Sequence, residues 1–403
     1  MKTYKWFFLM LVAGVFTACP SDSEEPLLGN WSVRGSFESS ERGHTASFVL
    51  ELGGKEYGYI ACGFNGKICL TGVFQYDPVR DIWTRQAEFP GAARGRAVGF
   101  AVNGKGYVGT GWDYRDVMMR DFWEFDPADG GSWKEVAPLP DQPNDPLERH
   151  SAVAFTLKDR NGKEFGYVGC GIFEGKETKV FKDFWKFDPD GETPRTDGIE
   201  PTYKGKWTKV VGNQGEKRYG GSAFVIDNKA YICLGYSNNS RATAKDLLQF
   251  DPNAASEDEI WVPKRKMYNA EKDQDFDDEY GDLARAFAAS FTMPGGEDGK
   301  MKGYIVSGIP TKTSTWEYDP IEDLWKQRTR YYNSQDATSA REGATGFSFP
   351  NTKHDPKTLA KNPNTIEKGR GFVCLGVHGT QMSAWDDVRE FFPREEDNIR
   401  DDY

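Results

Sequence analysis

The stretch at residues 94–133, RGRAVGFAVNGKGYVGTGWDYRDVMMRDFWEFDPADGGSW, decides the fold. It holds an apolar run from Arg94 to Phe100, a second run that ends at Gly111, the segment DFWEFDP and a last segment marked by Trp133. Gly, Asn, Asp and Pro separate these four segments, and aromatic and β-branched residues fill them. Such a pattern predicts a four-stranded antiparallel sheet. Because one sheet cannot bury both of its faces, it needs neighbours of the same kind.

The same pattern recurs along the chain, as it does in proteins built from repeats. An arginine stands six positions before a phenylalanine at Arg42, Arg94, Arg149, Arg218, Arg285 and Arg341. The second segment ends in a glycine at Gly63, Gly111, Gly171, Gly235, Gly308 and Gly376. The third segment ends in Asp-Pro in five copies, and the sixth copy, REFFP at 389–393, is degenerate. Six ordered copies predict an all-β protein, a six-bladed β-propeller with four antiparallel strands in each blade.

The tryptophan of the fourth segment indicates how the ring closes. It follows the third segment at Trp83, Trp133, Trp207, Trp261 and Trp325, but no tryptophan follows the sixth copy. Trp31 instead lies ahead of the first complete copy. We therefore expect the N-terminal segment to add the outer strand of the last blade, which joins the two ends of the ring and removes its exposed edges.

These repeats resemble kelch repeats, and the resemblance covers nearly all of residues 29–403. Kelch blades usually end the second strand with two glycines, and here the first of them is replaced by Cys62, Thr110, Cys170, Leu234, Ser307 and Leu375. The resemblance implies the propeller but no single function, since kelch propellers include peptide-binding adaptors, a copper oxidase of galactose and a bacterial sialic acid mutarotase. Copper oxidation is disfavoured because it needs a histidine pair, and His44 and His150 stand at different offsets from their arginines.

The first 18 residues are expected to be a signal peptide. Lys2 and Lys5 precede an apolar run that is too short to span a bilayer, and Cys19 follows that run. The junction resembles a bacterial lipobox, and the acidic stretch at 21–25 resembles the tether of surface lipoproteins of the Bacteroidetes type. The resemblance implies a lipid on Cys19 at the outer membrane, a tether at 19–28 and one propeller domain at 29–403. An ordinary secretory signal is the alternative.

The amino-acid composition limits the classes of partner that the chain is expected to bind. The formal charge of −11 makes a poor surface for nucleic acid or anionic lipid. No second hydrophobic stretch of spanning length follows Cys19, so we expect the lipid alone to attach the chain to a membrane. We expect a monomer with no cofactor or metal, because no glycine-rich phosphate loop or Cys and His metal spacing is present. Only Cys62 and Cys69 are placed to form a disulfide.

An acidic run at 273–279 looks at first like a calcium-binding loop. It has no glycine at the sixth position, and Ala284 stands where the bidentate glutamate of an EF-hand would fall. We therefore expect a solvated loop that partners nearby arginines.

The candidate site is the arginine ring, by which we mean Arg42, Arg94, Arg149, Arg218, Arg285 and Arg341. First strands line the channel of a propeller, so the ring is expected to encircle one mouth of it. Six like charges there repel one another unless something offsets them. Either the ring is paired inside the protein, with Glu148, Glu342, the acids at 273–279 or backbone carbonyls, or part of it binds an anion through bidentate contacts.

Loops on the arginine side carry Trp112 and Tyr236, whose flat rings suit sugar faces. We therefore expect a binding module for an acidic glycan or a protein, and we expect Arg149→Ala with Arg218→Ala to weaken binding at little cost in stability. The alternative is an enzyme such as a sugar mutarotase, which needs a general acid or base beside the ring. A carboxylate with a raised pKa at the mouth would favour the enzyme. The candidate groups are Glu148, Glu174, Glu342 and His378.

Overall fold

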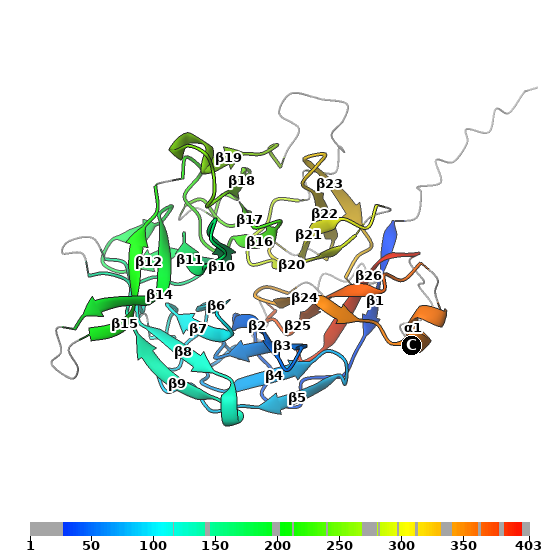
Figure 1. Cartoon of the computed structure of the whole chain (residues 1–403), viewed down its shortest axis with the longest axis horizontal. Coiled ribbons are helices and arrows are strands. Elements are labelled where there is room, and N and C mark those ends of the chain that lie inside the picture. Colours follow the sequence, from blue (N-terminus) through cyan, green and yellow to red (C-terminus); the bar gives the residue numbers. More distant parts are fainter. Residues whose placement is uncertain are drawn as a thin grey trace, which may run out of the picture.

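The computed structural model describes residues 27–396 except for 116, 142–145, 196–201, 212, 239–240, 268–279, 281–282, 296–297, 311–312, 332–340, 362–363 and 379–382. Six four-stranded antiparallel sheets are arranged in a ring (Figure 1). This confirms the six-bladed β-propeller. In the described part of the chain, no helix has the length and apolar character needed to cross a membrane.

The first three blades are continuous in sequence, and the strands of each follow one another from the channel outward. Blade 1 consists of β2 (Ala46–Leu52), β3 (Lys55–Ala61), β4 (Val73–Asp77) and β5 (Ile82–Arg85). Blade 2 consists of β6 (Val98–Val102), β7 (Lys105–Gly109), β8 (Phe122–Asp126) and β9 (Ser132–Val136). Blade 3 consists of β10 (Val153–Lys158), β11 (Glu164–Gly169), β14 (Phe184–Pro194) and β15 (Thr202–Lys209), with the hairpin β12 (Ile172–Glu174) and β13 (Thr178–Val180) beside it.

The last three blades follow the same order. Blade 4 consists of β16 (Ser222–Ile226), β17 (Lys229–Cys233), β18 (Leu247–Phe250) and β19 (Trp261–Pro263). Blade 5 consists of β20 (Ala289–Pro294), β21 (Met301–Val306), β22 (Thr315–Asp319) and β23 (Leu324–Arg328). Blade 6 consists of β24 (Thr345–Lys353), β25 (Lys368–Cys374), β26 (Val388–Glu396) and β1 (Leu28–Val33), and the short helix α1 (Pro356–Lys361) lies between β24 and β25.

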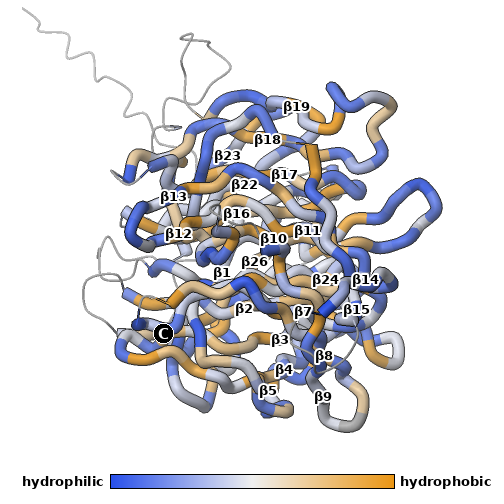
Figure 2. The backbone as a smooth tube through the Cα atoms, turned by 90° about the vertical axis from the view of Figure 1, so that its left-hand side faces the viewer, coloured by the Kyte–Doolittle hydropathy of each residue, from blue (hydrophilic) through white to orange (hydrophobic). Residues whose placement is uncertain are grey.

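The core lies between neighbouring blades. Side chains of the inner strands alternate between buried and half-buried, so the phenylalanine of each first strand faces one adjacent blade. Phe48 packs over Gly106 so closely that a Cβ atom there would come within 2.2 Å of the ring, and Phe100 does the same over Gly166. The small residue that opens the second-strand motif is therefore required by packing. Figure 2 shows hydrophobic stretches along the strands and hydrophilic stretches in the connecting loops.

The ring closes as the tryptophan pattern predicts. The N-terminal strand β1 pairs with β26 and places Trp31 opposite Phe391. The Trp31 side chain is 5 % exposed, and its ring lies 4.8 Å from the rings of Tyr331 and Phe391. Its indole N–H donates to Thr315 Oγ1 of blade 5 at 3.1 Å, so one side chain joins two blades.

Deleting residues 1–36, which removes β1, is expected to lower the melting temperature of the whole propeller. Burial of one tryptophan contributes about 1.5–3 kcal/mol, and the deletion also exposes an edge of β26. Differential scanning calorimetry measures the effect, with a chain lacking only residues 1–26 as the matched control. Equal melting temperatures for the two deletions would show that the last blade closes without β1.

Candidate functional site

The six side chains of the arginine ring are buried, with at most 3 % of any of these residues exposed. In blade 3, Arg149 Nη1 donates to the carbonyl oxygen of Cys170 at 3.0 Å. The same guanidinium contacts both carboxylate oxygens of Asp183, at 2.6 and 3.1 Å, and lies 3.8 Å from the ring centre of Phe181. The side chain therefore runs along its own blade and bridges the end of the second strand to the start of the third.

The other blades repeat this arrangement. Each ring arginine donates to the carbonyl oxygen at the end of its second strand, which belongs to Cys62, Thr110, Cys170, Leu234, Ser307 or Leu375. Four of them also pair with an aspartate, namely Asp121, Asp183, Asp246 or Asp387. In blades 1 and 5 the described partners are neutral, and burial lowers the pKa of Arg42 to about 10 and that of Arg285 to about 9.

This geometry favours internal pairing of the ring, which is the first of the two alternatives that the sequence left open. The backbone carbonyls are among the partners we expected, but the carboxylates are aspartates rather than Glu148 or Glu342. Glu148 instead pairs with Arg120 at 3.3 Å. The acidic run at 273–279 lies outside the described residues. Burial explains the outcome, because a charge removed from water needs partners in the protein.

The residues that replace the first kelch glycine keep the backbone conformation of a glycine. Cys62, Thr110, Cys170, Leu234, Ser307 and Leu375 have φ between 58° and 65°. This left-handed conformation costs about 1–2 kcal/mol for a residue with a side chain. The carbonyl group of each of these residues accepts the hydrogen bond from the ring arginine of its blade, which offsets part of that cost.

A closed ring of backbone hydrogen bonds lies just beyond the arginines and surrounds the mouth of the channel. The residue two positions after each ring arginine has φ between 53° and 62°, and these residues are His44, Arg96, Ser151, Gly220, Phe287 and Gly343. The N–H group of each donates to the carbonyl of its equivalent in the preceding blade, at 2.7–2.9 Å. The six bonds hold this turn in the same place in every blade, so side chains from these turns gather around one opening.

A cavity of about 450 Å³, which we call the cup, lies at this opening. Its apolar lining consists of Tyr219, Tyr236, Phe287, Ile309 and Pro310. Its charged or titratable lining consists of Arg96, His150, Glu174, Arg241 and Glu342. The two sets come from five different blades, so the cup is chemically asymmetric although its backbone repeats six times.

Arg96 is a half-buried cation of the cup. Its guanidinium lies between the rings of Trp112 and Phe287, 5.2 and 5.3 Å from their centres. Its Nε atom is buried without a hydrogen-bond partner, and no ion pair joins Arg96 to another described residue. Burial lowers the pKa of Arg96, while Glu342 and Glu174 act in the opposite direction. The guanidinium thus presents donors to the cavity without a protein carboxylate on them.

Glu342 is a half-buried carboxylate of the cup. It follows Arg341, and its backbone exchanges two hydrogen bonds of 2.9 Å with Val377, which fix its position. No hydrogen bond from a described residue reaches its carboxylate. Burial raises the pKa of Glu342 above its ordinary value, although Arg96, Arg241 and His378 lower it. A raised pKa makes this carboxyl group better suited than an ordinary glutamate to exchange a proton with a ligand.

A histidine and a second carboxylate lie on the blade 3 side of the cup. His150 Nε2 and Glu174 Oε2 are 2.9 Å apart, and His150 Nδ1 lies 2.9 Å from Ser151 Oγ. Burial lowers the pKa of His150, against the opposing effect of Glu174. The hydrogen bond with His150 is the main cause that lowers the pKa of Glu174. Both shifts favour a pair that consists of a neutral imidazole and an ionised carboxylate.

The remaining predicted residues are placed as follows. Tyr236 lines the cup, whereas Trp112 supports Arg96 by stacking on its guanidinium. Cys62 and Cys69 are buried free thiols, so they form no disulfide.

Arg96 was not among the residues predicted from the sequence. The signal that would have indicated it is its position two residues after a ring arginine. Among the described residues, no group of three or more His, Cys, Asp or Glu side chains is arranged to hold a metal ion.

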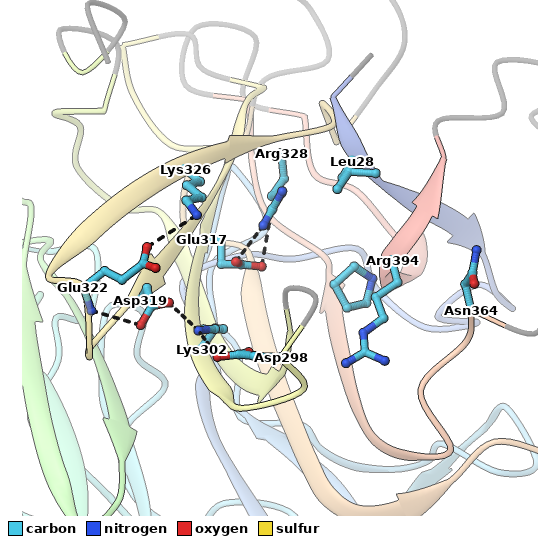
Figure 3. Close-up of a pocket in the computed structure, with 11 residues that line it drawn as sticks. Leu28, Asp298, Lys302, Glu317, Asp319, Glu322, Lys326, Arg328, Asn364 and Arg394 are labelled. Carbon is cyan, nitrogen blue, oxygen red and sulfur yellow. Dashed lines mark hydrogen bonds and ion pairs between the residues drawn. The ribbon is translucent and has the colours of Figure 1, made fainter. Parts of the chain in front are cut away.

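A larger cavity of about 770 Å³ lies between blades 5 and 6 and is shown in Figure 3. Its charges are largely paired within the protein: Arg328 binds Glu317 at 2.7 Å, and Lys326 lies 3.4 Å from Glu322. Lys302, which is also buried, contacts both Asp298 and Asp319. Because these pairs already satisfy the buried charges, the smaller cup is the better candidate site.

The substitution Arg149→Met is expected to lower the free energy of unfolding by about 3–5 kcal/mol, because it leaves Asp183 without its counter-charge in a buried position. This reverses our expectation for Arg149 and Arg218 from the sequence. Urea unfolding followed by circular dichroism measures the change, with the exposed Arg115→Met as control. An unchanged midpoint for Arg149→Met would argue that the ring is dispensable for folding.

Comparisons with known proteins support the fold. No protein-family model matches the sequence, and no curated protein matches it significantly. A solved structure titled "Structure of YjhT" aligns with a TM-score of 0.56 and 14 % sequence identity, over 89 % of this chain and 96 % of that chain. At this identity the likeness concerns the fold alone. The protein is a six-bladed β-propeller with an asymmetric charged cup at one mouth of its channel.

Proposed function

We propose that the cup binds a small sugar acid, such as a uronic acid, a sialic acid or the terminal residue of an acidic glycan. The observation that carries this proposal is the half-buried Arg96 guanidinium, which lies between two aromatic rings and has no ion pair with a described residue. Glu342 and Glu174 support the charge of Arg96 from a distance, but neither pairs with it directly, so a carboxylate from solution can take up the direct contact. The planar guanidinium suits a bidentate contact with a carboxylate.

The rest of the cup suits a sugar ring better than a long peptide. Tyr219, Tyr236 and Phe287 offer aromatic surfaces, and Ile309 and Pro310 extend the apolar side. The C–H faces of a sugar ring pack on such surfaces while its hydroxyls meet polar groups. A volume of about 450 Å³ falls in the range typical of small-molecule sites. These features favour an acidic glycan over a protein as the partner.

A sugar mutarotase is the second candidate, because the cup contains both a proton donor and a proton acceptor. Mutarotation opens the sugar ring by protonating the ring oxygen and deprotonating the anomeric hydroxyl, and closure returns both protons without any redox change. Glu342, whose pKa burial raises, is suited to protonate the ring oxygen. Glu174, bonded to His150, is suited to accept the hydroxyl proton. The kelch resemblance includes an enzyme of this class.

Saturation-transfer NMR is expected to detect binding of sialic acid or glucuronate but not of glucose, which lacks the carboxylate. Arg96→Gln is expected to weaken binding of the sugar acid at least about tenfold, since a buried charged hydrogen bond contributes about 1.5–3 kcal/mol. Arg115→Gln, an exposed arginine in a loop of the same side, is the matched control. Unchanged affinity in Arg96→Gln would place the site elsewhere.

The same samples separate the two candidate functions. A mutarotase would accelerate exchange between the α and β anomers of the bound sugar acid, and Glu342→Gln would remove the acceleration while the sugar still binds. Exchange at the rate of buffer alone would leave binding as the function.

We also propose that the protein is a lipoprotein held at the outer membrane by Cys19, which lies outside the described residues. The apolar run before Cys19 and the acidic stretch after it support this proposal. Cys19→Ser is expected to release the protein from the membrane fraction and to abolish incorporation of a labelled fatty acid, because the lipid is the expected attachment. A variant that still sediments with membranes would contradict the lipid anchor.

A further inference from the structure

We propose that a sugar acid enters the cup together with one proton, which Glu342 takes up, so that affinity for the anion rises as the pH falls. This inference rests on the proposed function and concerns how the same site is regulated. It makes Glu342 the residue that decides how strongly the cup prefers an acidic ligand at a given pH.

The first support is the balance of charge in the cup. Two arginines, Arg96 and Arg241, share the lining of one cavity with two carboxylates, Glu174 and Glu342. An added carboxylate from a ligand would leave three negative groups around two positive ones. Like charges in a partly desolvated site repel strongly, so one carboxyl group is expected to take up a proton when the anion binds.

Glu342 is the carboxyl group best placed to take that proton. Glu174 is bonded to His150, and its pKa is lowered by that bond. Glu342 accepts no hydrogen bond from a described residue, and burial already raises its pKa in the free cup. The arginines that partly stabilise its ionised form are the groups that a ligand carboxylate would occupy. Binding therefore removes part of the support for charge on Glu342 and adds a negative neighbour.

The other titratable groups around Glu342 are less suited to this role. His44 lies next to Gly343, and burial together with Arg96 holds the pKa of His44 well below its usual range. Burial also lowers the pKa of His150. Burial raises the pKa of Tyr219 and Tyr236, so both phenols stay neutral. His378, whose charge acts on Glu342 from the blade 6 side, is the remaining group that has to be tested.

The sign of the pH dependence follows from linkage. If the pKa of Glu342 is higher in the complex than in the free protein, the ligand binds the protonated form more tightly. Affinity then increases by at most about tenfold per pH unit as the pH falls from the bound pKa to the free pKa, and it is level outside that window. A neutral sugar brings no charge into the cup, so lowering the pH is not expected to make glucose bind.

Isothermal titration calorimetry with sialic acid and with glucuronate, in two buffers of different ionisation enthalpy, tests the proposal by counting protons. Wild-type protein is expected to take up a net fraction of one proton per ligand, and Glu342→Gln is expected to take up none while binding at least as tightly at pH 7. Glu148→Gln, outside the cup, is the matched control and keeps the uptake.

The possible outcomes distinguish a failure of this proposal from a failure of the proposed function, binding of a sugar acid in the cup. Proton uptake that persists in Glu342→Gln would assign it to a histidine and overturn the inference, as would binding without any uptake in wild type. If neither sugar acid binds wild type or Glu342→Gln between pH 5 and 8, the proposed function itself fails. Infrared difference spectra of wild type against Glu342→Gln give an independent check, because the protonated carboxyl band is expected to grow when sialic acid is added.

Discussion

The buried arginine at the start of each blade is the constraint on which the mouth of the propeller depends. Its guanidinium is removed from water, so it needs protein acceptors, and it finds them where the second strand of the blade ends and the third begins. These contacts fix the chain at the entry of the blade. The residue two positions later then joins a closed ring of six backbone hydrogen bonds. Burial of a charge thus determines which side chains surround the opening.

The repeated backbone carries side chains that do not repeat, and this is how a symmetric fold obtains an asymmetric site. Blade 2 supplies Arg96 at the position where blade 4 has Gly220 and blade 5 has Phe287. Blade 6 supplies Glu342 directly after its ring arginine, where blade 5 has Ala286. The candidate site therefore consists of departures from the repeat, and the repeat itself keeps the cup in place.

Spacing along the chain was sufficient to predict the six blades and the closure by Trp31, because both follow from periodic burial. The spacing was not sufficient to predict the candidate site. A pattern of arginines shows that a cation recurs, but it does not show whether the side chain points into the channel or along the blade. The aspartate that opens the third strand in four blades, as Asp121 does, was visible in the sequence and would have indicated internal pairing. Glu174 and Glu342 were identified as candidate acids, whereas Arg96 was hidden beside the stronger repeat.

We propose that a sugar acid binds in the cup through Arg96 rather than through the arginine ring. A crystal structure of the protein with bound sialic acid or glucuronate tests this most directly. We predict a carboxylate against the Arg96 guanidinium, with Glu342 facing the sugar and the six ring arginines still bonded inside their blades. A ligand found on a ring arginine, or bound only in the cavity between blades 5 and 6, would contradict it.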